Sequence, residues 1–222
     1  MTDATTILKQ ATAVLLDFDG PVTLLMPAPM NVETADACRS AIWDSGGALP
    51  DEIATTSNHL AVIHWAGEHA PSALADVEAA AVAAEVAAAQ TCVPTQGAHE
   101  MLVGLYEAGV PVVIVSNNAA DAIRVYLDKH GVAEYVRAVI GRPAERPDLM
   151  KPHPHSVLRA LEAVNAEAAS AVMIGDSVSD IEVALKTGVR TIGYAKTHLR
   201  GEELRHARAD AITPNMGTLV PA

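Results

Sequence analysis

Residues 12–23 read TAVLLDFDGPVT, an uninterrupted apolar run that ends in two acids and a glycine. Similar short apolar runs, rich in β-branched residues and bounded by turn residues or charges, recur further along the chain. Runs of this length and composition are typical of strands that are covered on both faces of a sheet. The sequence therefore predicts strands over residues 12–16, 112–115, 136–140, 171–174 and 191–194.

Stretches with helical spacing lie between these predicted strands. Gly109, Gly131 and Gly188 follow three of the stretches, at the position where a glycine commonly ends a helix. Alternation of strands and helices implies a mostly parallel sheet with helices on both faces, which is the doubly wound α/β class. The predicted helices cover residues 98–108, 119–130, 154–164 and 179–187.

Residues 21–92 break the alternation, because they contain helix-forming stretches and no convincing strand. We interpret them as an α-helical cap domain that is inserted between the first strand and the rest of the sheet. The core domain then consists of residues 1–20 and 93–222. The helical stretches of the insert are residues 32–44, 51–68 and 72–90.

The composition narrows the range of partners. A formal net charge of −12 repels nucleic acid and anionic lipid, so we expect neither as a partner. The N-terminus lacks the basic region of a signal peptide, and its apolar run is too short to span a membrane. A cytoplasmic protein is expected, in which Cys38 and Cys92 are idle thiols.

Ligands of a doubly wound sheet bind beyond the carboxyl ends of its strands. Polar residues follow these ends at several places in the sequence, so we expect them to gather at one edge of the sheet. They are Asp17 and Asp19 after the first strand, Ser116 and Asn117 after the second, Lys151 between the third and fourth, and Gly175, Asp176 and Asp180 at and after the fourth.

The acids of this set predict a metal site. Asp17 and Asp19 are two residues apart on an extended segment, so their side chains can point the same way. Asp176 adds a third carboxylate, and such a group suits a hard divalent cation with oxygen ligands, usually Mg²⁺ where phosphate is also bound. Gly20 lets the chain turn close to that ion.

Three of the other residues also have ordinary structural interpretations. Ser116 could cap the helix predicted at 119–130. Lys151 could be a solvated loop lysine, although the proline after it stiffens the loop and could aim its ammonium group inward. Asp180 could complement the N-terminus of its own helix or orient a metal-bound water.

Four motifs, in order and with matching spacing, resemble those of the haloacid dehalogenase superfamily. They are DFDGPVT at 17–23, VIVSNN at 113–118, the lysine of LMKPHP at 149–154, and MIGDSVSD at 173–180. The insert resembles the helical cap of the subgroup that includes phosphoglycolate phosphatase and β-phosphoglucomutase. The resemblance therefore implies a Rossmann-like core with an inserted cap.

The resemblance also implies a mechanism. Asp17 would be the nucleophile and would form an aspartyl-phosphate. Asp19 would protonate the leaving group and then deprotonate the attacking water. Mg²⁺ would be held by Asp17, the main-chain carbonyl of Asp19 and Asp176.

The remaining motif residues would hold the phosphoryl group and its surroundings. Ser116, the amide of Asn117, and Lys151 would bind phosphoryl oxygens. Asp180 would support the metal from further out, and Thr23 would orient Asp19.

Single residues separate the chemistries within the superfamily. The resemblance implies that dehalogenation does not use an acid such as Asp19, and that phosphonate cleavage needs a cap lysine, which residues 21–92 lack. A mutase would need a second phosphate anchor. The insert has nine acidic residues and one fixed cation, Arg39, which we take as a candidate specificity residue. His59, His64 or His69 could assist Arg39.

The sequence therefore predicts a Mg²⁺-dependent phosphatase that hydrolyses a small phosphorylated metabolite. Its leaving group would be neutral, cationic, or a small carboxylate paired to Arg39. Three alternatives remain: a phosphosugar mutase, a non-catalytic binding protein of the same superfamily, and a signalling receiver domain. The order of the acids and the helical insert argue against the receiver domain.

Overall fold

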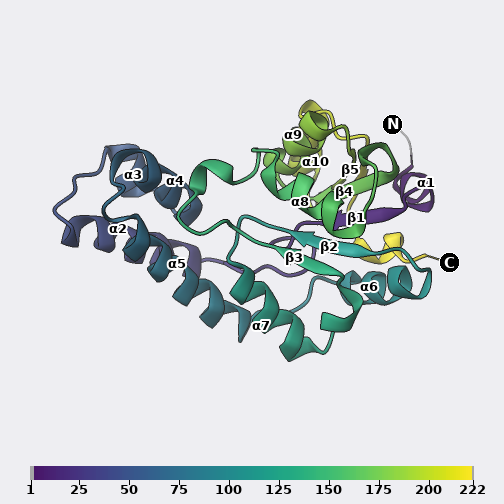
Figure 1. Ribbon diagram of the computed structural model, residues 1–222, viewed down its shortest axis with the longest axis horizontal. Helices are drawn as coiled ribbons and strands as arrows, with labels where there is room; N and C mark the ends of the chain where they lie inside the picture. The colour runs from purple at the N-terminus through teal and green to yellow at the C-terminus, as the bar shows by residue number, and fades with distance from the viewer. Residues whose placement is uncertain (1–2, 222) are drawn as a thin grey trace.

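The computed structural model describes residues 3–221, and a parallel sheet lies at the centre of the larger of its two lobes (Figure 1). Within these residues the sheet has six strands in the order β3-β2-β1-β4-β5-β6, and every pairing is parallel. The predicted mostly parallel α/β sheet is therefore confirmed. The strands are β1 (Ala13–Leu16), β2 (Val112–Val115), β3 (Ala138–Ile140), β4 (Ala171–Gly175), β5 (Arg190–Tyr194) and β6 (Ala211–Thr213).

Helices cover both faces of the sheet because the side chains of each strand alternate between the faces. Val14 and Leu16 pack with α1, α6 and α7, whereas Ala13 and Leu15 pack with α8 and α9. Both faces are apolar and buried, as the continuous apolar runs require. The core helices are α1 (Ala4–Lys9), α6 (Ala98–Glu107), α7 (Ala120–His130), α8 (His155–Val164), α9 (Val178–Thr187) and α10 (His198–His206).

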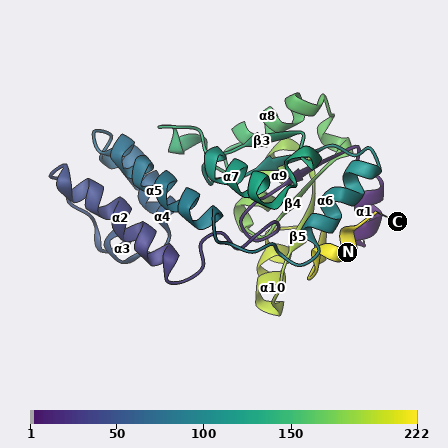
Figure 2. The same ribbon diagram turned by 90° about the horizontal axis from the view of Figure 1, so that it is seen from below.

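The smaller lobe consists of α2 to α5, which lie in the chain between β1 and α6 (Figure 2). These helices share a hydrophobic core of their own, and α5 also packs along α7 of the larger lobe. Asn58 begins α4 by accepting a hydrogen bond from the Leu60 amide at 3.0 Å, so the helix predicted at 51–68 is divided in two. The bounds are α2 (Met30–Asp44), α3 (Asp51–Thr55), α4 (His59–His69) and α5 (Leu74–Ala89).

Several elements were not predicted from the sequence. They are α1, β6, α10 and four short 3₁₀ segments, η1 (Ala133–Tyr135), η2 (Pro147–Leu149), η3 (Ala168–Ser170) and η4 (Met216–Leu219). The domain boundaries near residues 20 and 92 stay a prediction. None of the helices between residues 3 and 221 has the length and apolar character needed to span a membrane.

The strand order reverses at β1, where the chain moves outward to β2 and β3 and later returns to β4 on the other side. The register sets Leu16 level with both Ile114 and Ile174. The residues that follow these three positions therefore emerge side by side at the carboxyl edge of the sheet, at the topological switch point where such folds bind ligands.

Candidate active site

A cavity of about 480 Å³ opens at this carboxyl edge, between the sheet and α4 of the smaller lobe. It brings together residues as far apart in the sequence as Asp17 and Ser179. From the sheet side it is lined by Asp17, Asp19, Ser116, Asn117, Asn118, Lys151, Asp176, Ser177 and Ser179. From the linker, the smaller lobe and the loop before Lys151 it is lined by Leu24, Asn58, Leu60, Ala61, His64 and Met150.

Asp17 and Asp19 are held by main-chain amides directly after β1. The Phe18 amide donates to Asp17 Oδ1 at 2.8 Å, and the Leu25 amide donates to Asp19 Oδ1 at 2.8 Å. The Phe18 side chain between them points into the core, with its ring 5.2 Å from that of Tyr126. The alternation sends both carboxylates to the cavity side, as the spacing predicted.

Lys151 enters the site as a buried cation. Its Nζ donates to Asp17 Oδ1 at 2.9 Å, to Asp180 Oδ1 at 2.6 Å and to the Val115 carbonyl at 3.0 Å. Burial alone would lower the pKa of Lys151, but the charges of Asp17 and Asp180 outweigh burial and raise it. The interpretation of Lys151 as a solvated loop lysine is therefore wrong.

The acids at this edge repel one another. Burial raises the pKa of Asp17 well above its usual range, and Asp180 raises it further. Burial, followed by the charges of Asp180 and Asp19, raises the pKa of Asp176 to about 7. Carboxylate oxygens of Asp17, Asp176 and Asp180 lie within 4.8 Å of one another. This donor set, with Lys151 as its contacting cation, suits a divalent metal ion with oxygen ligands.

Gly20 allows the approach of one of these acids. Its φ is +105°, which favours glycine, and a Cβ at this position would collide with the Asp176 carboxylate. Gly20 was predicted to let the chain turn close to a metal ion, and the structure gives it a steric role beside Asp176, one of the predicted ligands.

Ser116 and Asn117 follow β2 and line the same cavity as the acids. The Asn117 side chain clamps the loop that carries Lys151: it accepts from the Lys151 amide at 2.8 Å and donates to the Lys151 carbonyl at 3.0 Å. Ser116 Oγ donates to Asn118 Oδ1 at 3.1 Å. Ser116 does not cap α7, since that helix begins at Ala120 after Ala119.

The sequence model of the family described as "Haloacid dehalogenase-like hydrolase" matches residues 51–194, more than half of the chain. The chain belongs to this family. Phosphoglycolate phosphatase of Photobacterium profundum is 28% identical over 124 residues, which cover 56% of this chain and 53% of that protein. Phosphoglycolate phosphatase of Vibrio cholerae is 30% identical over 122 residues, which cover 54% and 52%. The chain thus spans about half the length of these curated relatives.

Solved structures agree on the fold of this haloacid dehalogenase-like hydrolase. CbbY from Rhodobacter sphaeroides, crystallised in complex with phosphate, superposes with a TM-score of 0.70 at 20% identity. The superposition covers 94% of this chain and 96% of that chain, so it includes both lobes.

Three supporting residues of this hydrolase were predicted from its motifs. Gly175 is required sterically, because a Cβ there would collide with Asp180. Asp180 makes a capping box with Ser177 at the start of α9 and also binds Lys151, so it combines its structural interpretation with a place in the site. The Thr23 hydroxyl donates to the Val93 carbonyl at 2.7 Å, and this hydrogen bond joins the two linkers. The side-chain oxygen of Asp19 instead accepts a hydrogen bond from the Leu25 amide.

The structure does not bring Arg39 to the cavity. Its side chain is buried in the smaller lobe, where Nη1 donates to the carbonyls of Ile53 at 3.2 Å and Thr56 at 2.6 Å. Arg39 therefore fixes the segment between α3 and α4. The sequence could not reveal this because the acceptors are main-chain oxygens of another helix end.

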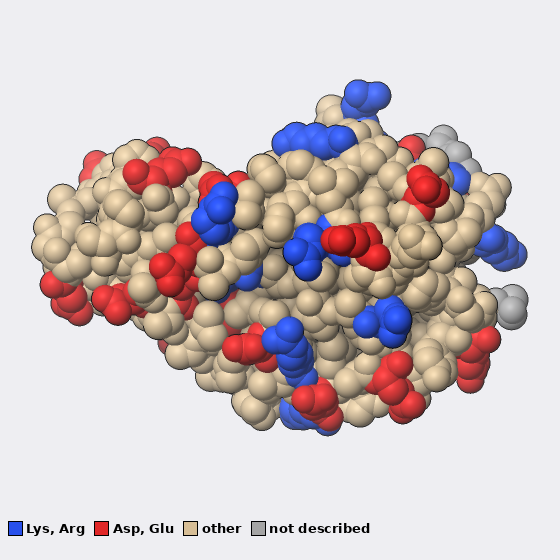
Figure 3. Space-filling view, viewed as in Figure 1, with Lys and Arg blue, Asp and Glu red and all other residues tan. Residues whose placement is uncertain are grey.

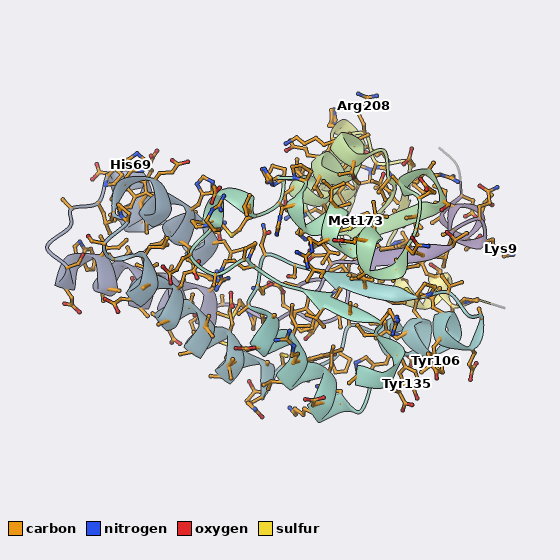
Figure 4. The ribbon with its side chains drawn as sticks, in the orientation of Figure 1. Lys9, His69, Tyr106, Tyr135, Met173 and Arg208 are labelled. Carbon is orange, nitrogen blue, oxygen red and sulfur yellow. The ribbon has the colours of Figure 1, made fainter. Side chains whose placement is uncertain are left out.

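The cap histidines separate into three roles. His64 lines the cavity, and His59 is buried with Nε2 2.9 Å from Glu85 Oε1. His69 stacks on Trp65 and lies on the outer part of the smaller lobe, far from Met173 of β4 (Figure 4). Of these three histidines, only His64 is among the described residues that line the cavity, so it alone is in place to contact a substrate there.

Sequence reasoning missed Glu85, a fully buried acid in α5. Burial would raise its pKa, but the hydrogen bond from His59 and the charge of Arg142 hold the pKa at about 2. One signal was available: Glu78 and Glu85 are seven residues apart, so they share a face of an otherwise alanine-rich helix.

Proposed function

We propose that the protein is a Mg²⁺-dependent phosphatase that hydrolyses a small-molecule phosphate monoester in the cytoplasm. One observation carries the proposal: Asp17 and Asp19 face the same cavity as Ser116, Asn117 and Lys151. A nucleophile and a proton carrier thus share one cavity with a hydroxyl, an amide and an ammonium group that suit phosphoryl oxygens.

The hydrogen bonds at Asp17 indicate which oxygen attacks. Phe18 and Lys151 both donate to Oδ1, which leaves Oδ2 to attack phosphorus. The bond between phosphorus and the leaving oxygen breaks, and Asp19 gives that oxygen a proton. Asp19 then takes a proton from a water that attacks the aspartyl-phosphate, which releases phosphate and restores Asp17.

Lys151 and the proposed Mg²⁺ ligands would stabilise the negative charge of the phosphoryl group. Lys151 neutralises phosphoryl charge without moving, because Asp17, Asp180 and the Val115 carbonyl already fix its ammonium group. Asp17, the Asp19 main-chain carbonyl and Asp176 would hold Mg²⁺, with Asp180 in support. When bound, this ion would supply neutralisation of the phosphoryl oxygens and of the clustered carboxylates.

The cavity wall formed by the smaller lobe limits which leaving group can bind. Asn58, Leu60, Ala61 and His64 line it, and Arg39 is committed elsewhere. A second phosphate would therefore find no fixed cation among the lining residues contributed by α4 and by Asn58, the residue that caps its N-terminus. This favours an uncharged leaving group, or a small carboxylate that meets His64, and it argues against the mutase alternative.

The experiment is a panel of phosphate monoesters with and without Mg²⁺. The panel contains a generic aryl phosphate, phosphoglycolate because the relatives bear that name, a neutral sugar monophosphate and a sugar bisphosphate. We expect Mg²⁺-dependent turnover and a preference for monophosphates. Lack of turnover with every divalent metal would favour a non-catalytic binding protein, and a strong preference for bisphosphates would contradict the proposed leaving group.

A further inference from the structure

Glu85 lies near the end of α5, in the smaller lobe, yet its carboxylate is completely buried. Oε1 accepts hydrogen bonds from His59 at 2.9 Å, Asn118 at 3.2 Å and Arg142 Nη1 at 3.0 Å. Oε2 accepts from the Ala119 amide at 2.8 Å. A buried carboxylate that is satisfied in this way holds its donors in a defined arrangement.

Two of the donors lead directly to the proposed phosphate-binding residues. Asn118, held by Glu85, accepts the hydrogen bond of the Ser116 hydroxyl. Arg142, paired with Glu85, donates to the Asn117 carbonyl at 2.9 Å. Glu85 thus reaches Ser116 and Asn117, two of the three proposed phosphate-binding residues, through one intermediate each, although it belongs to the opposite lobe.

The Ala119 contact adds the start of a helix. Ala119 precedes α7, and its amide is one of the main-chain donors that a helix start leaves without an internal partner. No side chain of α7 caps this end, and the Glu85 carboxylate binds it from the other lobe. This contact fixes the loop of residues 116–119 from its far end.

The remaining donor leads to the opposite wall of the cavity. His59 is the first residue of α4 and stands between Asn58 and Leu60, which both line the cavity. The hydrogen bond from His59 to Glu85 therefore sets the wall that faces the leaving group. A single carboxylate joins the two sides of the site.

We propose that Glu85 is a positioning residue that aligns the phosphate-binding loop with the leaving-group wall. This inference rests on the proposed phosphatase function. Glu85 itself touches neither the nucleophile nor the proton carrier through any hydrogen bond found among residues 3–221. Its effect should therefore appear in phosphate binding, through Ser116 and Asn117.

The test variant is Glu85→Gln, which keeps the shape of the side chain but replaces one acceptor oxygen with an NH₂ group. Whichever way the amide turns, that group faces either the Ala119 amide or the donors of His59, Asn118 and Arg142. At least one donor then loses its acceptor. Hydrogen bonds to charged groups of this kind are strong, so we expect roughly a tenfold weaker hold on phosphate.

The matched control is Glu78→Gln, two turns earlier on the same face of α5. Glu78 is also buried, but it accepts from the Glu145 amide at 2.9 Å, lies 3.9 Å from Arg142 Nε without a hydrogen bond to it, and has no hydrogen bond to residues 116–119. For wild type and both variants, the competitive inhibition constant of inorganic phosphate and its calorimetric dissociation constant are measured with Mg²⁺ in excess. Urea unfolding reports stability in parallel.

We expect both phosphate constants to rise about tenfold in Glu85→Gln and to stay within about twofold of wild type in Glu78→Gln. An inhibition constant does not depend on the fraction of folded enzyme, so a purely structural role would lower stability and leave it unchanged. Equal phosphate constants in wild type and Glu85→Gln would overturn the inference while the proposed function stands. A wild type with no turnover on any monoester would contradict the proposed function, and calorimetry would still test the inference.

If Glu85→Gln does not fold, Asn118→Ala provides the second measurement. It leaves Glu85 with His59, Ala119 and Arg142, and it removes both the amide group that Asn118 donates to Glu85 and the acceptor of the Ser116 hydroxyl. We expect a threefold to tenfold rise in the phosphate inhibition constant. An unchanged constant in this variant would contradict the route from Glu85 through Asn118 to Ser116.

Discussion

The edge of the sheet and the helical lobe above it use charge in opposite ways. At the edge, the buried Lys151 binds two buried carboxylates directly, those of Asp17 and Asp180. On the helical lobe most acids lie outside, where Figure 3 shows them over its surface, while Lys and Arg gather mainly over the larger lobe. The sheet edge thus concentrates charge in the interior, and the helical lobe presents a nearly neutral wall to the same cavity.

This difference in charge burial indicates that the sheet edge and the helical lobe have different roles. Buried charges are costly, and the carboxylates of Asp17, Asp176 and Asp180 outnumber the one cation among the described residues that contacts them, Lys151, so their presence at the sheet edge requires a compensating role such as catalysis or ion binding. The helical lobe buries Arg39, Glu78 and Glu85, but these pair within the lobe or with the core loops. Changes at the sheet edge should therefore abolish chemistry, and changes in the helical lobe should tune binding or stability.

The largest effect is expected for Asp17→Asn. The amide keeps the size of the side chain but removes the attacking carboxylate, so we expect the turnover number to fall by a factor on the order of 10⁴ or more. Steady-state turnover of an aryl phosphate checks this, together with acid-quench detection of phosphorylated protein. Retained covalent labelling in the variant would contradict the assignment of Asp17 as nucleophile.

Lys151→Met should produce the largest loss of stability. It leaves the Asp17 and Asp180 carboxylates buried without their shared cation, and breaking such a pair typically costs about 3–5 kcal/mol. Urea unfolding without added metal measures the loss. The control is Lys186→Met, since Lys186 is exposed and donates only to the Pro152 carbonyl, so we expect a change within about 0.5 kcal/mol. Similar losses in both variants would remove the contrast between buried and surface charge.

The sheet edge could be predicted from the sequence because its residues depend on strand order. Asp17, Ser116 and Asp176 follow strands whose apolar runs are evident, and parallel strands must bring these ends together. The helical lobe could not be predicted to the same depth. The positions of Arg39 and Glu85 depend on which helices face each other, and helical periodicity alone does not determine that.

The missed core elements have a related cause. β6 is three residues long, and α10 is strongly polar with few buried side chains, so neither carries a clear periodic pattern. The predicted helix at 51–68 was divided because the Asn58 cap competes with helix continuation, a local hydrogen bond that outweighs propensity.

Acid should weaken the link between the lobes through Glu85. Its pKa is about 2 in the folded protein against an ordinary value of 4.5, because His59 and Arg142 outweigh the effect of burial. The resulting stabilisation is complete above pH 4.5 and is lost as the pH falls toward 2; its size is on the order of 3 kcal/mol. Of the other charged groups around it, Glu78 lies 3.9 Å from Arg142, and burial raises the pKa of the nearby Asp19.

Urea unfolding of wild type and Glu85→Gln between pH 3 and pH 6 isolates the contribution of Glu85. We expect the difference in unfolding free energy between the two proteins to shrink as the pH falls. A difference that stays constant over this range would show that Glu85 is not a stabilising carboxylate in the folded protein.

The smallest effects are expected for Arg39 and His64, and they should fall on different quantities: stability for Arg39 and kcat/KM for His64. Arg39→Ala removes the hydrogen bonds to the Ile53 and Thr56 carbonyls, so we expect a loss of about 1–3 kcal/mol in unfolding free energy and an unchanged kcat/KM. His64→Ala should leave stability unchanged and shift kcat/KM twofold to tenfold, by an amount that differs between leaving groups. His69→Ala is the control, because His69 lies on the same helix and stacks on Trp65 outside the cavity. The contrary result would be that Arg39→Ala changes the preference among phosphate monoesters and His64→Ala does not. The leaving group would then contact a part of the helical lobe other than the wall formed by Asn58, Leu60, Ala61 and His64. In that case the lack of a fixed cation in that wall would no longer limit the choice of substrate.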